Sequence, residues 1–306
     1  MRNRFSGTLL TTAAAAVAFF LSLAVKPNES EGQAYRAPRL SGTAHPNLSG
    51  IWQAMNTANY DIQAHPARPA LAVRAGPVPG SEVPRAPVLA FGAVGGVPAG
   101  LGVVEGNEIP YQPWAAVRKK ENFENWLTRD PEIRCYLPGV PRATYMPFPF
   151  QIVQSTNIVF IVYESGSANR TIYMDRAESS PIDTWMGHSI GRWDGDTLVV
   201  DVTSFNDQTW FDRAGNFHSE ALHVIERYTP VSFDHLSYEV TIEDPKVFTR
   251  PWKMRMPLYR RKEPTAQILE YKCQEFVEEL LYGHLSKQPS SVMEDYRRWY
   301  TESRNP

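Results

Sequence analysis

The sequence predicts a mainly β protein, an antiparallel up-and-down barrel with flanking helices and an irregular N-terminal extension. From about residue 143 onward, apolar and polar residues alternate with a period of two, as in strands that bury one face. Short polar turns separate these segments, and consecutive hairpins close most easily into a barrel because closure removes exposed edges. The 8 Trp, 14 Tyr and 25 Pro suit strands, turns and aromatic-lined cavities better than a helical bundle.

We expect one barrel domain over residues 37–285, with its first strand at "SGIW". The stretch at 64–113 is rich in Pro, Gly, Ala and Val and keeps no regular period, which predicts an irregular excursion, either wrapped on the core or partly disordered. The dipeptide Asp194-Gly195 followed by Asp196 predicts a two-residue hairpin. The other strands are predicted within TYMPFPFQIVQS, NIVFIVYES, NRTIYMD, HSIGRWDGDTLVVDVTSF, SEALHVIERYTPV, HLSYEVTIED, WKMRMPLYRR and QILEYKCQ.

Two helical regions flank the strands. One amphipathic helix is predicted at about 114–128, with Pro113 near its start and Asp130-Pro131 closing it. Its apolar positions at helical spacing are Trp114, Val117, Phe123, Trp126 and Leu127. The C-terminal segment at 286–306 returns to helical spacing and is predicted to form a helical tail.

Residues 1–36 have the pattern of an export signal. Arg2 and Arg4 form a basic start, residues 8–25 are mostly apolar, and "SLA" at 22–24 fits cleavage after Ala24. The alternative is an uncleaved N-terminal anchor, since the apolar run is long enough to span a bilayer. In either case the folded part is expected outside the cytoplasm, periplasmic or extracellular, with membrane contact only through this segment.

The two cysteines of the chain, Cys135 and Cys273, are expected to form a disulfide in an oxidising compartment. This bond would tie the start of the sheet region to its last predicted strand. Metal binding by two isolated cysteines is a weaker interpretation, because zinc takes four ligands at recognisable spacing.

Composition disfavours several classes of partner. The formal net charge is −2, from 31 basic and 33 acidic side chains, so no basic stripe for nucleic acid is indicated. The glycine-rich segments "GVPAG" and "GAVGG" lack the strand–turn–helix setting of a nucleotide loop, and no cofactor is expected. A small-molecule ligand is the expected partner, since a barrel of about eight strands can hold one.

The opening Gly-x-Trp followed by a meander of strands is similar to the lipocalin and calycin pattern, in architecture alone. A longer signature resembles a large group of exported bacterial proteins usually called hypothetical. The matching residues are "WMGHSIGRWDGDTLVVDV" and "FNDQTWFDRAGNFHSEALHVIERY", supported by "CYLPGVPRATYMPFPFQIVQ", "EDPKVFTRPW" and "LEYKCQEF". The resemblance covers about residues 47–285 and implies that the loop at 206–218 belongs to the signature. It implies no reaction.

The loop "NDQTWFDRAGNFH" gathers polar side chains and is too long for a tight hairpin. Its Asn, Asp and Gly residues are ordinary turn formers, and one hypothesis is that they only staple the loop. The other is that Asp212 and His218 meet at the barrel mouth as an acid/base pair, because a carboxylate orients an imidazole and raises its pKa.

The strands on either side of this loop add three candidate site residues, Asp201, His223 and Glu226. Strict alternation would place His218 and Glu226 on one face and His223 on the other, which disfavours one metal bound by both histidines. His223 is then the more inward histidine, either as a reactive group or as a core residue with its hydrogen bonds made. Asp201 is predicted to face into the barrel, either paired with Arg227, Arg170 or His223, or as a carboxylic acid whose pKa burial raises.

The function predicted from these features is binding of a small apolar or aromatic molecule, with acid/base lyase, hydratase or isomerase chemistry as an extension. The proton-carrying candidates are Asp201, Asp212, His218 and His223. The ligand-binding candidates are Asn206, Trp210, Glu226 and Arg227. Two alternatives stay open: a non-catalytic envelope module for binding or structure, and a metal-dependent hydrolase.

Overall fold

The computed structural model describes residues 35–69, 73–75, 82–84, 96–176 and 180–275. The elements below belong to the compact unit that begins at Ala37. The predicted export segment lies outside the described residues except for its last two, and the predicted tail at 286–306 lies wholly outside them.

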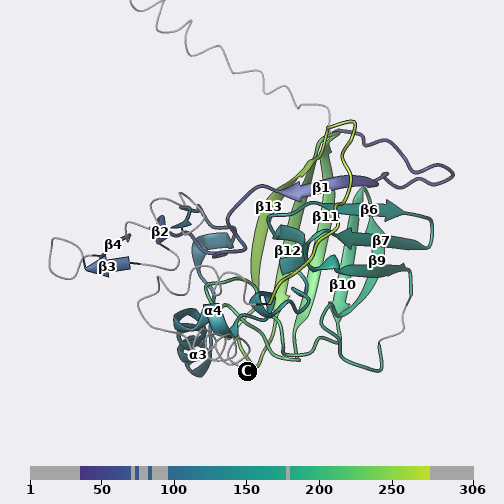
Figure 1. Ribbon diagram of the computed structural model, residues 1–306. Helices are drawn as coiled ribbons and strands as arrows, with labels where there is room; N and C mark the ends of the chain where they lie inside the picture. Colours follow the sequence, from purple (N-terminus) through teal and green to yellow (C-terminus); the bar gives the residue numbers. More distant parts are fainter. Residues whose placement is uncertain (1–34, 70–72, 76–81, 85–95, 177–179, 276–306) are drawn as a thin grey trace, which may run out of the picture. The chain divides into compact units, whose positions relative to one another are not determined.

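Nine strands close into a barrel in the order β1-β13-β12-β11-β10-β9-β8-β7-β6. Figure 1 shows β13, β12 and β11 as long neighbouring strands, with β1 crossing beside β6. The bounds are β1 Gly50–Ala54, β6 Phe150–Gln154, β7 Ile158–Tyr163, β8 Asn169–Met174, β9 His188–Asp194, β10 Thr197–Thr203, β11 His223–Ser232, β12 His235–Glu243 and β13 Trp252–Arg260. The prediction of a mainly β protein with a closed barrel is confirmed.

The ring of described strands has one pair of neighbours that run the same way. β8 pairs with β9 in parallel, while the other eight neighbouring pairs are antiparallel. The prediction of antiparallel pairing throughout is wrong at this contact, and the reason is arithmetic: strict alternation of direction cannot close around an odd number of strands. Strand β9 therefore begins at the end of the barrel where β8 also begins, as parallel neighbours require.

Alternation of apolar residues explains the strands and places the core inside the ring. β12 and β13 bury every second residue, so that one face of each packs inward and the other meets solvent. The predicted turn after Asp194 is confirmed: Thr197 pairs with Asp194 across the two-residue loop, and Gly195 supplies the positive φ of 59°. Large buried side chains line this interior, among them Trp52, Phe150, Tyr163, Tyr228, Tyr238, Ile242 and Met254.

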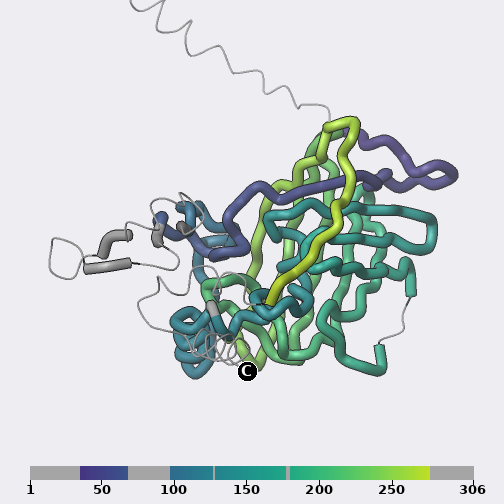
Figure 2. The backbone as a smooth tube through the Cα atoms, in the orientation of Figure 1, coloured from purple at the N-terminus to yellow at the C-terminus, as the bar shows by residue number. Residues whose placement is uncertain are grey.

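Two strand predictions are wrong. The run of consecutive barrel strands predicted from residue 143 begins at Phe150, because residues 142–145 form the single-turn helix α5 (Arg142–Tyr145). The segment "QILEYKCQ" is not a strand, since β structure ends with β13. This segment instead continues outside the barrel, as Figure 2 shows for the yellow trace that crosses in front of the strands.

The disulfide between Cys135 and Cys273 is present, with its Cα atoms 5.6 Å apart. It does not reach a last strand, because Cys273 lies in the extended segment after β13. Leu269 N donates to the Glu164 carboxylate and Tyr271 packs edge-on against Phe148, so the same segment also contacts the β6–β7 region. The disulfide therefore fastens a strap, defined here as residues 261–275, to the chain that precedes β6.

The excursion at 64–113 is not wholly irregular. It contains two small antiparallel sheets, β2 (Arg68–Pro69) with β5 (Gly96–Val97) and β3 (Val73–Ala75) with β4 (Glu82–Pro84). It then forms the 3-10 turn η2 (Glu105–Asn107). Val104 makes a bridge to Met254 of β13, which extends the sheet beyond the end of β1. The last part of the excursion, which includes Val104, therefore packs against the barrel.

The helix predicted at 114–128 is broken into α3 (Pro113–Glu124) and α4 (Trp126–Arg129), separated at Asn125. The predicted apolar face is wrong for α3, because Trp114 and Val117 are 54% and 61% exposed. Its buried residues are Ala115 and Asn122. The Asn122 amide donates to Gly215 O, so α3 packs on the polar loop through small and polar contacts rather than through a broad apolar stripe.

Three connections meet at one end of the barrel. Strand β1 is antiparallel to β6, so β1 ends where β6 begins. The neighbours β1, β13, β12, β11 and β10 also alternate in direction, so the β10–β11 loop turns at the same end. The chain at 56–65, at 130–146 and at 204–222 therefore lies at this end, and we call these three segments the cap. The 130–146 segment contains the 3-10 turn η3 (Pro131–Arg134) and α5.

Candidate functional site

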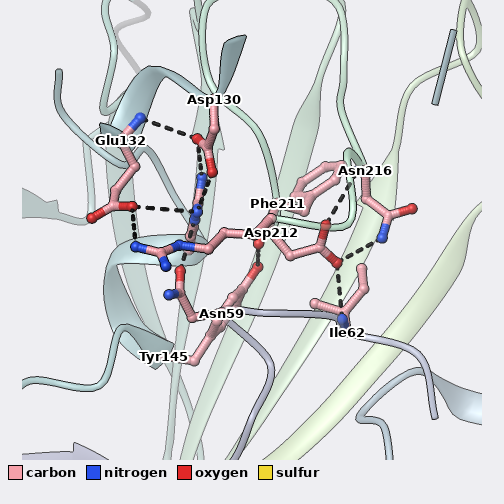
Figure 3. A network of polar contacts seen from close by, with 10 residues as sticks. Asn59, Ile62, Asp130, Glu132, Tyr145, Phe211, Asp212 and Asn216 are labelled. Carbon is pink, nitrogen blue, oxygen red and sulfur yellow. Dashed lines mark hydrogen bonds and ion pairs between the residues drawn. The ribbon is translucent and has the colours of Figure 1, made fainter. Parts of the chain in front are cut away.

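A buried ionic network holds the cap together (Figure 3). Arg142 on α5 donates from both terminal nitrogens to Asp130, at 2.7 Å each, and from Nε to Asn59 Oδ1. Arg142 and Asp130 side chains are 1% and 0% exposed. Burial acts to lower the pKa of Arg142, and the Asp130 charge outweighs it, so the pKa is raised. This pair is matched in charge and in hydrogen bonds, as a structural ion pair must be.

Asp212 sits in the same cap and is fully buried. Its carboxylate accepts from Ile62 N at 2.9 Å, from Asn216 N at 3.2 Å and from the Asn216 amide at 2.6 Å. Burial, with a contribution from the Asp61 charge, raises the pKa of Asp212 to about 7, and the three donors oppose that shift. Asp212 therefore joins the 56–65 segment to the loop through backbone groups, the arrangement expected of a staple.

His218 is buried and makes hydrogen bonds at both ring nitrogens. Nδ1 lies 2.9 Å from Ser219 O, which can only accept, so Nδ1 carries the proton. Nε2 then accepts from the Thr209 hydroxyl at 2.6 Å. Burial lowers the pKa of His218, consistent with this neutral form. The predicted acid/base pair does not form, because Asp212 and His218 bind different partners.

Asp201 and His223 lie on the outer face of the sheet, which corrects both inward predictions. In β11 the buried positions are Val224, Glu226 and Tyr228, so His223 points away from the interior. In β10 the inward positions are Leu198, Val200 and Val202, which leaves Asp201 outside. The expected pairing with His223 is present at 3.2 Å.

The outer face around this pair is a ladder of opposite charges. Arg192 donates to Asp201, with side chains 55% and 31% exposed, and the other ring nitrogen of His223 faces Glu243 at 3.1 Å. Ion pairs with this exposure contribute little to stability. The ladder is a solvated surface of the sheet rather than a reactive pocket.

The predicted alternation through 218–222 also fails. Strand β11 begins only at His223, because Ser219–Ala221 form a turn in which Ser219 N and Oγ both donate to Asp244. Of the ligand-binding candidates, Arg227 lies on the outer face and pairs with Asp194, and Asn206 accepts from Gln208 N in the loop. Trp210 is buried and makes a bridge to Phe217.

The structure therefore does not gather the predicted residues at one mouth. Two of the four proton-carrying candidates face outward, and two are bound within the cap. Glu226 is the exception among all candidates, because it points into the barrel and is fully buried. Its surroundings form the strongest candidate site in the described chain.

Glu226 forms the centre of an interior polar cluster. Arg170 Nη2 on β8 donates to Glu226 Oε2 at 2.5 Å, with the two side chains 2% and 0% exposed. The other carboxylate oxygen accepts from two tyrosine hydroxyls, Tyr228 at 2.9 Å and Tyr238 at 2.6 Å. Burial and then the Glu226 charge raise the pKa of both phenols well above the usual value. The carboxylate is thus fully supplied with donors.

The hydrogen bonds of Arg170, by contrast, are incomplete. Its Nε and Nη1 are buried and have no hydrogen-bond partner among the described residues. Burial acts to lower the pKa of Arg170 and Glu226 outweighs it, so the group stays charged with its pKa raised well above the usual value. A buried unpartnered donor costs about 1–3 kcal/mol, and more when it is charged. These N–H groups therefore call for an acceptor oxygen inside the barrel.

The interior cluster is joined to the cap through α5. The Thr144 hydroxyl lies 3.3 Å from the Tyr163 hydroxyl, and burial, the largest cause, raises the pKa of Tyr163 while Arg170 opposes it. Within the same turn of helix, Tyr145 donates to Phe211 O in the loop at 2.8 Å. All four residues of α5 are buried. The helix is the common wall between the cap network and the barrel interior.

The sequence analysis named Arg170 as a pairing partner but did not identify this cluster. A signal was present: in β8, Arg170 alternates with Ile172 and Met174, so a cation shares a face with apolar side chains. Glu226 and Tyr228 likewise share a face of β11 with Val224. What the strand pattern could not show is which face of β11 turns inward, since both faces mix apolar and polar residues.

Within the described residues, no cluster of three or more His, Cys, Asp or Glu side chains could hold a metal ion. None of the helices in the described ranges has the length and apolar character needed to cross a membrane. Comparison of the chain with models of known protein families gives no match, and neither does comparison with curated proteins.

Proposed function

We propose that this protein is an exported binding protein whose calycin-like barrel holds a small, largely apolar or aromatic molecule at the Arg170–Glu226 cluster. The observation that carries the proposal is the pair of buried, unpartnered nitrogens on Arg170. A folded interior rarely leaves charged donors without acceptors, and ligand sites combine apolar walls with a few convergent polar groups.

The surroundings of Arg170 support a ligand with a flat apolar body. The rings of Tyr228 and Tyr238 lie 4.8 Å apart, and those of Phe150 and Tyr163 lie 5.5 Å apart. These rings pack tilted against one another, and aromatic side chains of this kind also pack against the rings of bound ligands. The ligand's oxygen would accept from Arg170 while its body contacts this aromatic wall.

Export and family are part of the same proposal. The disulfide supports an oxidising compartment, and the N-terminal pattern supports passage across the inner membrane. The long signature around residues 185–228 supports membership in the group of exported bacterial proteins that it resembles. The acid/base extension has less support, since the four residues proposed for it do not share a site.

Native mass spectrometry of the protein purified from its native host tests this function. The wild-type chain is expected to carry a noncovalent mass of a few hundred daltons, and Arg170→Gln is expected to lose it. The matched control is Arg192→Gln, an arginine paired with a carboxylate on the outer face, which should keep the bound mass. Wild-type protein that carries and binds no small molecule would overturn the proposal.

A second candidate is a non-catalytic structural module of the envelope. The large buried side chains of the barrel and the stapling roles of Asp212 and His218 favour it. In that case buried water satisfies Arg170, and Arg170→Gln leaves the mass spectrum of the native protein unchanged apart from the substitution.

A further inference from the structure

The charge inside the barrel limits the chemistry of the ligand. Among the described residues of the nine strands, the buried charged side chains are Arg170 and Glu226. They pair at 2.5 Å, so the interior carries one positive and one negative charge and is neutral as a whole. Any further charge enters a low-dielectric region with no free counter-charge, which costs several kcal/mol.

The atoms of the Arg170–Glu226 cluster that lack a hydrogen-bond partner in the described chain are all donors. Glu226 already accepts from Arg170, Tyr228 and Tyr238, and each phenol uses its proton on that carboxylate. The atoms of the cluster that lack a partner among the described residues are therefore Arg170 Nε and Nη1, which donate. The Ser189 hydroxyl on β9 is also buried without a partner in the described chain and can donate as well. A ligand that offers acceptor oxygens fits these donors.

Resting on the proposed function, we infer that the barrel selects uncharged aromatic molecules bearing a carbonyl oxygen, such as aryl ketones, and excludes the corresponding carboxylates. The carbonyl accepts from Arg170 and adds no charge beside Glu226. A carboxylate would accept from the same donors, but it would leave the interior with a net negative charge next to Glu226.

The test uses two probes with the same ring system and different charge. Isothermal titration calorimetry measures the Kd of 2-acetylnaphthalene and of 2-naphthoate with the full-length wild-type protein at pH 8. The ketone is expected to bind at least about tenfold more tightly, which is the minimum effect of an uncompensated charge of this kind. The exposed pair variant Arg192→Gln should give the same ratio.

A single substitution should invert this preference. Glu226→Gln removes the negative charge and leaves Arg170 as a buried cation, so 2-naphthoate should now bind more tightly than the ketone. The same acid should raise the melting temperature of Glu226→Gln and leave that of the wild type unchanged. Because a ligand that binds only the folded state raises the melting temperature, this readout also serves where the variant is only marginally stable.

The outcomes separate the inference from the proposed function. If the wild type binds 2-naphthoate as tightly as the ketone, or if Glu226→Gln keeps the ketone preference, the inference is overturned while binding itself stands. If the wild type binds neither this pair nor acetophenone and benzoate, and native protein carries no ligand, the proposed function is overturned and the inference with it.

Discussion

Two arginines buried in the same fold differ in how their donors are used. In the cap, Arg142 donates through Nε, Nη1 and Nη2, with Asp130 taking two of these bonds and Asn59 the third. In the barrel interior, Arg170 makes one bond to Glu226, while its Nε and Nη1 have no partner in the described chain. Both ion pairs are almost inaccessible to solvent.

This difference indicates which of the two buried ion pairs stabilises the fold. A buried ion pair offsets its desolvation only when geometry and further hydrogen bonds are good, and the cap pair meets both conditions. The interior pair meets the first condition and not the second. We therefore expect replacement of the whole ion pair to affect folding at Arg142–Asp130 and ligand binding at Arg170–Glu226.

The largest effect is expected at the cap. Arg142→Met leaves Asp130 as a buried, uncompensated charge and should lower the free energy of unfolding by about 3–5 kcal/mol. Urea denaturation measures this value. The exposed control Arg192→Gln should cost less than about 1 kcal/mol. Equal losses for the two variants would remove the distinction between cap and surface pairs.

The disulfide should come next, because it fastens the strap beside η3 of the cap. Cys135→Ser combined with Cys273→Ser should lower the free energy of unfolding by about 2–5 kcal/mol, since the bond closes a long loop with a separation of 138 residues. A reductant should bring the wild type to the value of the double variant and leave that variant unchanged. A reductant effect on the variant would point to a different cause.

Asp212 should give the cap a dependence on pH. At pH values between 3.8, the ordinary pKa of an aspartate, and about 7, the pKa of folded Asp212, the folded chain holds a proton that the unfolded chain has released. The free energy of unfolding therefore falls as pH rises through this window, by on the order of 1 kcal/mol per pH unit, and levels off above it.

Urea denaturation at pH 5, 6, 7 and 8 checks this pH dependence, with Asp212→Asn expected to flatten the slope. Asp207→Asn, a change at an exposed carboxylate of the same loop, should keep the wild-type slope. A wild-type slope in Asp212→Asn would show that other groups carry the dependence.

The smallest effect is expected when both members of the interior pair are replaced. Arg170→Met with Glu226→Gln should change the free energy of unfolding by no more than about 1 kcal/mol, because the double variant buries no charge and removes two unpartnered donors. The matched cap variant, Arg142→Met with Asp130→Asn, should still lose at least about 2 kcal/mol. It gives up the bond to Asn59 and weakens the bond from Glu132 N. Similar losses for both double variants would contradict the comparison.

Local patterns predicted the strands and the hairpin at Gly195, because alternation and turn chemistry act between near neighbours in sequence. They did not predict the parallel contact of β8 with β9, which depends on the total number of strands. Local patterns also failed to predict which face of the sheet carries Asp201. Both faces of β10 are apolar, and Val199 and Val200, on opposite faces, are both fully buried. The helix face was misjudged because α3 packs on a polar loop.

The candidate site shows the same division. The sequence marked the loop at 206–218 as polar, and the structure uses that polarity to hold the cap. It named Glu226 but could not assemble the interior cluster, because Arg170 on β8 lies 56 residues before Glu226 in the sequence. Contacts across a closed sheet depend on register around the whole ring.

The odd number of strands limits how such a barrel can arise. Copying a two-stranded unit always yields an even ring, so repetition alone cannot generate this one. Descent from an even ancestor would require the gain or loss of a lone strand, and the same-direction contact between β8 and β9 marks where the pairing of hairpins is interrupted.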